Sequence, residues 1–84
     1  MVKIIYKTPY NHIFKKEKER IKGNTLGEII DRIINKYNIK SIEYAFVTYD
    51  YPGKETESLS ARKDLDYQVK PKGTLSFTWY IGGG

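Results

Sequence analysis

The feature that most constrains the fold is a single amphipathic helix that the sequence predicts from residue 25 onward. Thr25 and Glu28 have the spacing of a capping box, in which the threonine hydroxyl accepts the Glu28 backbone N–H and the carboxylate reaches back. Apolar residues then recur at helical spacing along one side: Leu26, Ile29, Ile30, Ile33, Ile34 and Tyr37. Because isoleucine is a poor intrinsic helix former, this stripe needs tertiary packing. We therefore predict a helix that ends near Asn38 and fills the centre of the core.

Strand patterns surround this helix. β-Branched and aromatic residues alternate with others over residues 2–7 and 42–47, and both segments are predicted strands. Residues 12–22 are interpreted as a second strand that forms a hairpin with the first, and residues 67–70 as a further short strand. Residues 55–66 are predicted to be a loop or an irregular short strand, with Leu59 and Leu65 as apolar anchors. Proline, glycine and asparagine mark turns between these segments, at residues 8–11, 51–54 and 71–73.

The last strand, over residues 74–81, has the clearest pattern. Its two faces are apolar (Leu75, Phe77, Trp79, Ile81) and hydroxyl-bearing (Thr74, Ser76, Thr78, Tyr80). We expect Phe77 and Trp79 in the core, which leaves Thr78 and Tyr80 on the opposite face of the sheet.

A helix and a sheet that each have one apolar face must bury those faces against each other. With 84 residues there is room for one domain only. We expect a right-handed crossover from the second strand to the third, with the first and last strands at the centre. The predicted fold class is α+β: a roll in which a mixed sheet of four to five strands packs on one main helix.

The net charge of +5 arises entirely in the first quarter of the chain. Residues 1–23 contain seven Lys or Arg and two Glu, whereas residues 24–84 carry eight charges of each sign. Most of the excess lies in residues 15–22, KKEKERIK. This run is either an electrostatic footprint for nucleic acid or an acidic protein, or a solvated strand whose mixed charges block edge-to-edge pairing. We favour the second interpretation because two glutamates interrupt the run.

Several chemistries are excluded by composition. Cysteine is absent, which removes disulfides, thiolate metal sites and cysteine nucleophiles. A lone histidine, His12, does not supply a catalytic relay or a metal site, and Asp64 and Asp66 lack further ligands at metal-loop spacing. No apolar run approaches the roughly 18 residues of a membrane span. We expect a cytoplasmic protein without membrane contact that is no enzyme and binds no metal or cofactor of its own.

Three glycines follow the last strand directly. Glycine has no Cβ, so such a run can thread a narrow channel and leaves a terminal carboxylate unhindered. We divide the chain into a domain of residues 1–81 and a flexible tail made of Gly82, Gly83 and Gly84. The tail suits chemistry at the Gly84 carboxylate; its other interpretation is a frayed end or an expression remnant.

The element order, the Lys72–Gly73 turn before an apolar last strand and the ending WYIGGG resemble the β-grasp, ubiquitin-like sulfur carriers. These are the small subunit of molybdopterin synthase, the thiamine-biosynthesis sulfur carrier and the related protein modifiers. The stretch IKGNTLGEII, residues 21–30, resembles the entry of that family into its helix. The sequence departs from the family at Thr74, where an Asp is usual, and in lacking the proline often found before the tail.

The resemblance implies a carrier whose Gly84 carboxylate is adenylated by an E1-like adenylyltransferase, with ATP used by that partner. The activated carboxylate then becomes a thiocarboxylate, which a sulfur-accepting synthase would use, or an isopeptide with a target-protein lysine. Because Thr78 and Tyr80 alternate onto the face opposite Phe77 and Trp79, we expect Tyr80, Thr78 and Ile81 beside the tail to bind the partner. In the other interpretation, Tyr80 pairs with a side chain of a neighbouring strand.

Two other classes of function stay open. One is a non-conjugating β-grasp interaction module, for which the tail has no chemical role. The other, ranked last, is a small basic nucleic-acid-binding protein that uses residues 15–22 and the tyrosines.

Overall fold

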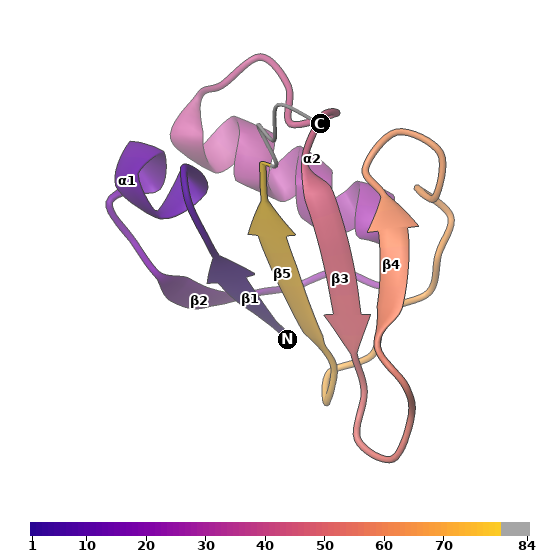
Figure 1. The fold of residues 1–84 in the computed structure, drawn as a ribbon. Coiled ribbons are helices and arrows are strands. Elements are labelled where there is room, and N and C mark those ends of the chain that lie inside the picture. The colour runs from indigo at the N-terminus through magenta and orange to yellow at the C-terminus, as the bar shows by residue number, and fades with distance from the viewer. Residues whose placement is uncertain (80–84) are drawn as a thin grey trace, which may run out of the picture.

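Five strands form one mixed sheet, and the longer of two helices lies across one of its faces (Figure 1). The computed structural model describes residues 1–79. The elements are β1 (Val2–Tyr6), α1 (Tyr10–Phe14), β2 (Lys18–Ile21), α2 (Leu26–Tyr37), β3 (Phe46–Asp50), β4 (Glu57–Ser60) and β5 (Thr74–Thr78). The predicted α+β class is confirmed, but the described chain has two helices where one main helix was expected.

The strand order is β2-β1-β5-β3-β4. β1 and β5 run parallel to each other, and the remaining neighbours are antiparallel. The first and last strands are therefore neighbours inside the sheet, as the sequence predicts, and α2 lies in the connection from β2 to β3.

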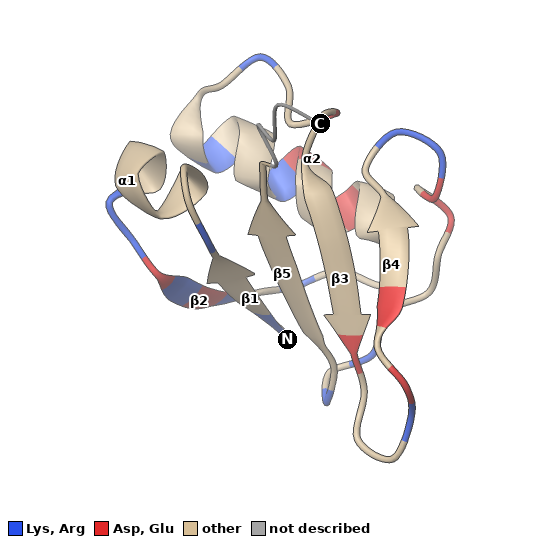
Figure 2. Cartoon of the chain, viewed as in Figure 1, with Lys and Arg blue, Asp and Glu red and all other residues tan. Residues whose placement is uncertain are grey.

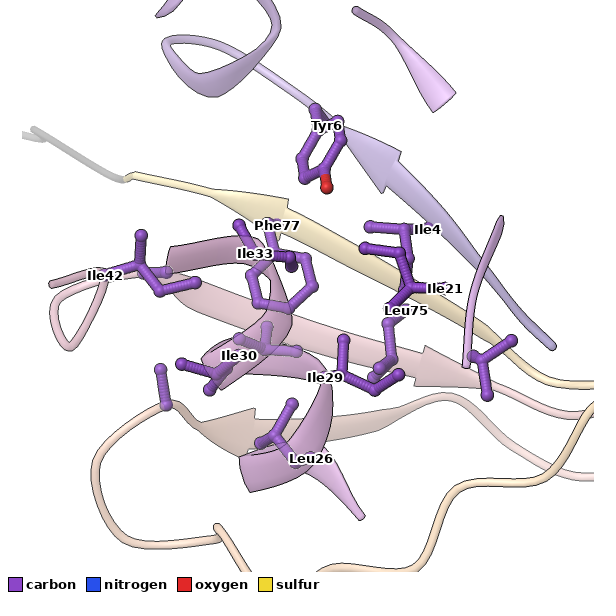
Figure 3. Packing of buried hydrophobic residues seen from close by; sticks show 14 of the residues in the cluster. Ile4, Tyr6, Ile21, Leu26, Ile29, Ile30, Ile33, Ile42, Leu75 and Phe77 are labelled. Carbon is purple, nitrogen blue, oxygen red and sulfur yellow. The ribbon is translucent and has the colours of Figure 1, made fainter. Parts of the chain in front are cut away.

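The core lies between α2 and the sheet (Figure 3). Ile4 of β1, Leu75 and Phe77 of β5 and Val47 of β3 point from the sheet toward the helix and are almost fully buried. The predicted apolar stripe faces them, and its most buried members are Leu26, Ile29 and Ile33. Burial of these large side chains supplies the packing that an isoleucine-rich helix needs.

Both ends of α2 are capped as predicted. The Glu28 backbone N–H donates to Thr25 Oγ1 at 3.2 Å, and Asn38 ends the helix in a left-handed conformation with φ of 53°. Two further amides at the helix start donate to the carbonyl oxygens of Leu65 and Tyr67. The segment after β4 is thus attached to the start of α2, and the strand predicted at residues 67–70 reduces to one bridge between Thr25 and Gln68.

The strand predicted over residues 12–22 is wrong in its first half. Tyr10 and Phe14 are four residues apart and lie buried on one side of the short helix α1. The Phe14 ring stacks on Tyr37 of α2 at 4.2 Å and meets Tyr6 of β1 edge-on at 4.9 Å. This aromatic cluster closes one end of the core. Its contacts stabilise the helical conformation, in which Tyr10 and Phe14 lie on the same side of α1.

The third strand begins later than predicted, at Phe46. Val47 and Tyr49 are buried, whereas Tyr44 and Phe46 are exposed. A shift of one residue exchanges the faces of a strand, and alternation alone does not say which face is inward.

Three further differences lie after β3. Residues 57–60 form a regular strand, β4, whose Leu59 is buried as predicted, but the second predicted anchor, Leu65, is exposed. The last strand ends at Thr78, and Trp79 is 44% exposed where a core position was predicted. The predicted turns at residues 51–54 and 71–73 are confirmed by the bonds from Lys54 N–H to Tyr51 O and from Gly73 N–H to Lys70 O.

Candidate functional site

The site predicted from the sequence is the end of the last strand and the tail that follows it. Of its residues, Tyr80, Ile81, Gly82, Gly83 and Gly84 lie outside the described residues. Thr78 lies at the end of β5, on the sheet face turned away from α2, opposite Phe46 of β3. The candidate site is therefore the surface around Thr78 and Trp79, from which the chain continues toward the glycines.

The end of β5 is attached to the turn after β1. Thr78 Oγ1 donates to the backbone oxygen of Thr8 at 2.9 Å, and the Trp79 N–H donates to the same oxygen at 3.3 Å. Lys7 N–H in turn donates to the oxygen of Phe77 at 2.8 Å. These bonds hold residues 77–79 against the turn after β1.

An exposed apolar surface surrounds this point. Trp79 lines a hollow of about 200 Å³ together with Ile13 of α1, Ile39 and Ile42 after α2, and Tyr44. We call this the tail-root hollow. Phe46 follows soon after Tyr44 in the sequence and is 48% exposed. It lies opposite Thr78 on the open face of the sheet. An apolar hollow flanked by exposed aromatic side chains is the kind of surface that protein partners use.

Sequence reasoning missed this surface. Trp79 was expected in the core, and the pattern over residues 42–47 did not say which of its two faces is exposed. No local signal in the sequence indicates this surface, because Trp79 meets α1 and the segment after α2 only in the folded chain.

A second arrangement of functional groups lies between β2 and α2. The largely buried carboxylate of Glu19 accepts hydrogen bonds from the hydroxyls of Tyr6, at 2.7 Å, and Tyr37, and it pairs with Lys36. Burial by itself raises the pKa of Glu19, but the bonds from Lys36, Tyr37 and Tyr6 outweigh it and hold the pKa below its ordinary value of 4.5. Burial and the bond to Glu19 raise the pKa of Tyr37 to about 12. The carboxylate thus ties β1, β2 and α2 together.

This carboxylate makes stability depend on acid. Because the folded state lowers the pKa of Glu19, its contribution is complete above about pH 4.5 and is lost as the pH falls below that value. We expect Glu19→Gln to lower the free energy of unfolding by about 1–2 kcal/mol at about pH 7. The difference from the parent protein should shrink toward about pH 3, measured by urea unfolding at both pH values. An equal loss of unfolding free energy at both pH values would contradict the role assigned to the Glu19 carboxylate. The control is Glu17→Gln, which changes an exposed glutamate of the same segment.

The described residues show no catalytic histidine arrangement and no metal centre. His12 lies exposed on α1, and within residues 1–79 no group of three or more His, Cys, Asp or Glu side chains could hold a metal ion. None of the helices in that part of the chain is long and apolar enough to cross a membrane.

No protein-family model matches this chain, and no curated protein matches it.

Proposed function

We propose that this protein is a β-grasp, ubiquitin-like carrier whose Gly84 carboxylate is the reacting group. A partner of the E1-like adenylyltransferase class activates that carboxylate, which then serves sulfur transfer or protein modification in the cytoplasm. The observation that carries the proposal is the position of the last strand: β5 lies inside the sheet between β1 and β3, and in the sequence three glycines follow soon after its end. A rigid strand that feeds a tail of minimal side chains suits delivery of a terminal carboxylate into a partner.

The topology supports the β-grasp assignment. A parallel central pair, β1 and β5, is flanked by antiparallel strands, and α2 occupies the crossover from β2 to β3. Because the helix covers one face only, the other face stays available to a partner (Figure 1).

The reaction needs no catalytic group on this chain. A Gly84 carboxylate oxygen attacks the α-phosphorus of ATP and pyrophosphate leaves, which produces an acyl-adenylate. A hydrosulfide equivalent then attacks the acyl carbon, AMP leaves, and a thiocarboxylate remains. In the other branch a lysine amine of a target protein displaces the activating group, loses a proton and forms an isopeptide. AMP is a far better leaving group than oxide, so adenylation is the step that makes either displacement possible.

The test is mass spectrometry of the C-terminal peptide from protein purified from its own host. A sulfur-for-oxygen replacement at Gly84 that reacts with an alkylating agent supports the sulfur carrier, and Gly84 joined to a lysine supports the modifier. Analysis of the peptide rather than the intact protein excludes oxidation of Met1 as the source of the same mass change. A plain carboxylate that stays unchanged with ATP and host extract would overturn the proposal in favour of a non-conjugating β-grasp module.

The tail-root hollow supplies the docking prediction. We expect Trp79→Ala to reduce activation of Gly84 by about tenfold or more, because exposed aromatic side chains commonly dominate interface energies. Formation of the thiocarboxylate in host extract over time is the measurement. The control is Tyr51→Ala, which removes a partly exposed aromatic ring just after the far end of β3. It should leave the rate of thiocarboxylate formation within about twofold of the parent rate. Equal rates for the parent protein and Trp79→Ala would exclude the hollow from docking.

A further inference from the structure

A cationic hollow lies along the free edge of the sheet, between β2 and α2. Its volume is about 490 Å³, and its lining residues are Arg20, Ile21, Arg32, Asn35 and Lys36, with no carboxylate among them. Lys36 is paired with Glu19, but within residues 1–79 neither Arg20 nor Arg32 has a carboxylate at salt-bridge distance. Figure 2 shows the Lys and Arg positions of α2 and the mixed basic and acidic positions of β2.

The two glutamates of the basic run contribute unequally to this surface. Glu19 points toward the core side, where its side chain is only 6% exposed and is bound by Tyr6, Tyr37 and Lys36. Glu17 is therefore the one exposed carboxylate within residues 15–22, and exposed Lys and Arg side chains surround it in the sequence. The edge is therefore more positive than the sequence of alternating signs indicates.

The backbone of β2 is also unpaired on its outer side. In the described chain β2 pairs with β1 alone. Tyr6 N–H donates to Glu17 O at 2.8 Å, so by the alternation of an antiparallel ladder Glu19 and Ile21 also bond to β1. The N–H and C=O groups of the residues between them, Lys18 and Arg20, consequently point away from the sheet, and both residues are exposed.

We propose that this edge binds an extended acidic segment of a partner protein, which adds to the sheet as a strand beside β2. The segment's backbone would pair with Lys18 and Arg20, and its carboxylates would lie against Arg20 and Arg32. This surface is two strands away from β5 and is independent of the chemistry proposed for Gly84.

The backbone geometry favours a peptide over a nucleic acid. Lys18 and Arg20 present both donors and acceptors at the spacing of a β-ladder, and a second polypeptide strand satisfies both kinds of group. A phosphate backbone accepts hydrogen bonds but offers no matching donors, so it would use the arginines and leave the carbonyl groups unpaired.

Fluorescence anisotropy of the full chain tests the proposal with a short labelled peptide in which Glu alternates with Thr. We expect Arg20→Ala combined with Arg32→Ala to weaken binding about fivefold to tenfold. The matched control removes two exposed cations elsewhere, Arg62→Ala with Lys63→Ala, and should change binding by less than about twofold. Equal losses for the two double variants would mean that net charge alone attracts the peptide, and would overturn the site.

Strand addition has its own test at Lys18. Lys18→Ala removes the charge, whereas Lys18→Pro also removes an outward N–H that the β1 ladder does not use. We expect Lys18→Pro to bind at least about threefold more weakly than Lys18→Ala, with both variants retaining the circular dichroism spectrum of the parent protein. Equal binding by the two variants would overturn pairing through the backbone. Tighter binding of a single-stranded oligonucleotide of the same charge, unaffected by Lys18→Pro, would assign the edge to nucleic acid instead.

Discussion

Removal of Gly83 and Gly84 is expected to abolish activation of the C-terminal carboxylate while leaving the folded domain unchanged. Each extended residue spans about 3.5 Å, so the shortened chain would hold its terminal carboxylate about 7 Å short of the reacting position. Reacting atoms must approach to about 3–3.5 Å, and a displacement of this size cannot be recovered by small movements of a partner.

The measurement is trapping with hydroxylamine in host extract that contains ATP. Hydroxylamine attacks the acyl-adenylate, AMP leaves, and the carboxylate is recorded as a hydroxamate by mass spectrometry. We expect the hydroxamate from the parent protein and only background from the truncated chain.

The control for this truncation is thermal unfolding. β5 ends at Thr78 and its end is held by the bonds to Thr8, so loss of the last two residues should leave the melting temperature within about 1 °C. Hydroxamate formation by the truncated protein at the parent rate would contradict the proposed role of Gly84. A large drop in melting temperature would contradict the assumption that the tail contributes nothing to the fold.

The parts of the fold that were predictable are those that local chemistry determines. The capping pair Thr25 and Glu28, the stripe that begins at Leu26 and the left-handed stop at Asn38 all act within a few residues of one another. The central position of the first and last strands also followed from sequence, since apolar strands gain most from two neighbours.

The parts that the sequence did not determine depend on contacts between distant segments. Phe14 belongs to a helix because it stacks on Tyr37, and nothing near Phe14 in the sequence reports that partner. Phe46 is exposed because the register of β3 against β5 turns Val47 inward. An alternating pattern carries both registers equally well, and the choice is made by the whole sheet.

Of the candidate site, the orientation of Thr78 was predictable, but the surface around it was not. The sequence indicates the end of the last strand, and Thr78 does lie there on the open face. The exposed side chain of Trp79 and the tail-root hollow arise only when α1 and the segment after α2 meet beside the strand end. The sequence likewise did not show that the two glutamates of residues 15–22 differ in exposure. Glu19 is largely buried because its carboxylate binds the hydroxyls of Tyr6 and Tyr37, which are distant in sequence.

Gly73→Ala is expected to be the most destabilising replacement of a glycine by alanine within residues 1–79. Gly73 is buried, and a Cβ built on it would overlap the phenol ring of Tyr49. That ring cannot move aside, because Tyr49 is itself buried and its hydroxyl accepts the Lys70 N–H at 2.9 Å. Gly73 cannot retreat either, since its carbonyl accepts the Lys3 N–H of β1 at 3.3 Å. We expect a loss of about 3 kcal/mol, or about 15 °C in melting temperature.

Two comparisons separate this overlap from other effects of replacing a glycine. Gly53 has φ of 81° and open space around it, so Gly53→Ala should cost only the backbone term of about 1 kcal/mol. In a Tyr49→Leu background the ring is gone, and the further cost of Gly73→Ala, measured by urea unfolding, should fall below about 1 kcal/mol. The same cost in both backgrounds would mean that the turn at Gly73 requires glycine for its conformation. The coupled result would mean that the turn preceding β5 is held by close packing on Tyr49, which would make that ring the element that sets where the final strand enters the sheet.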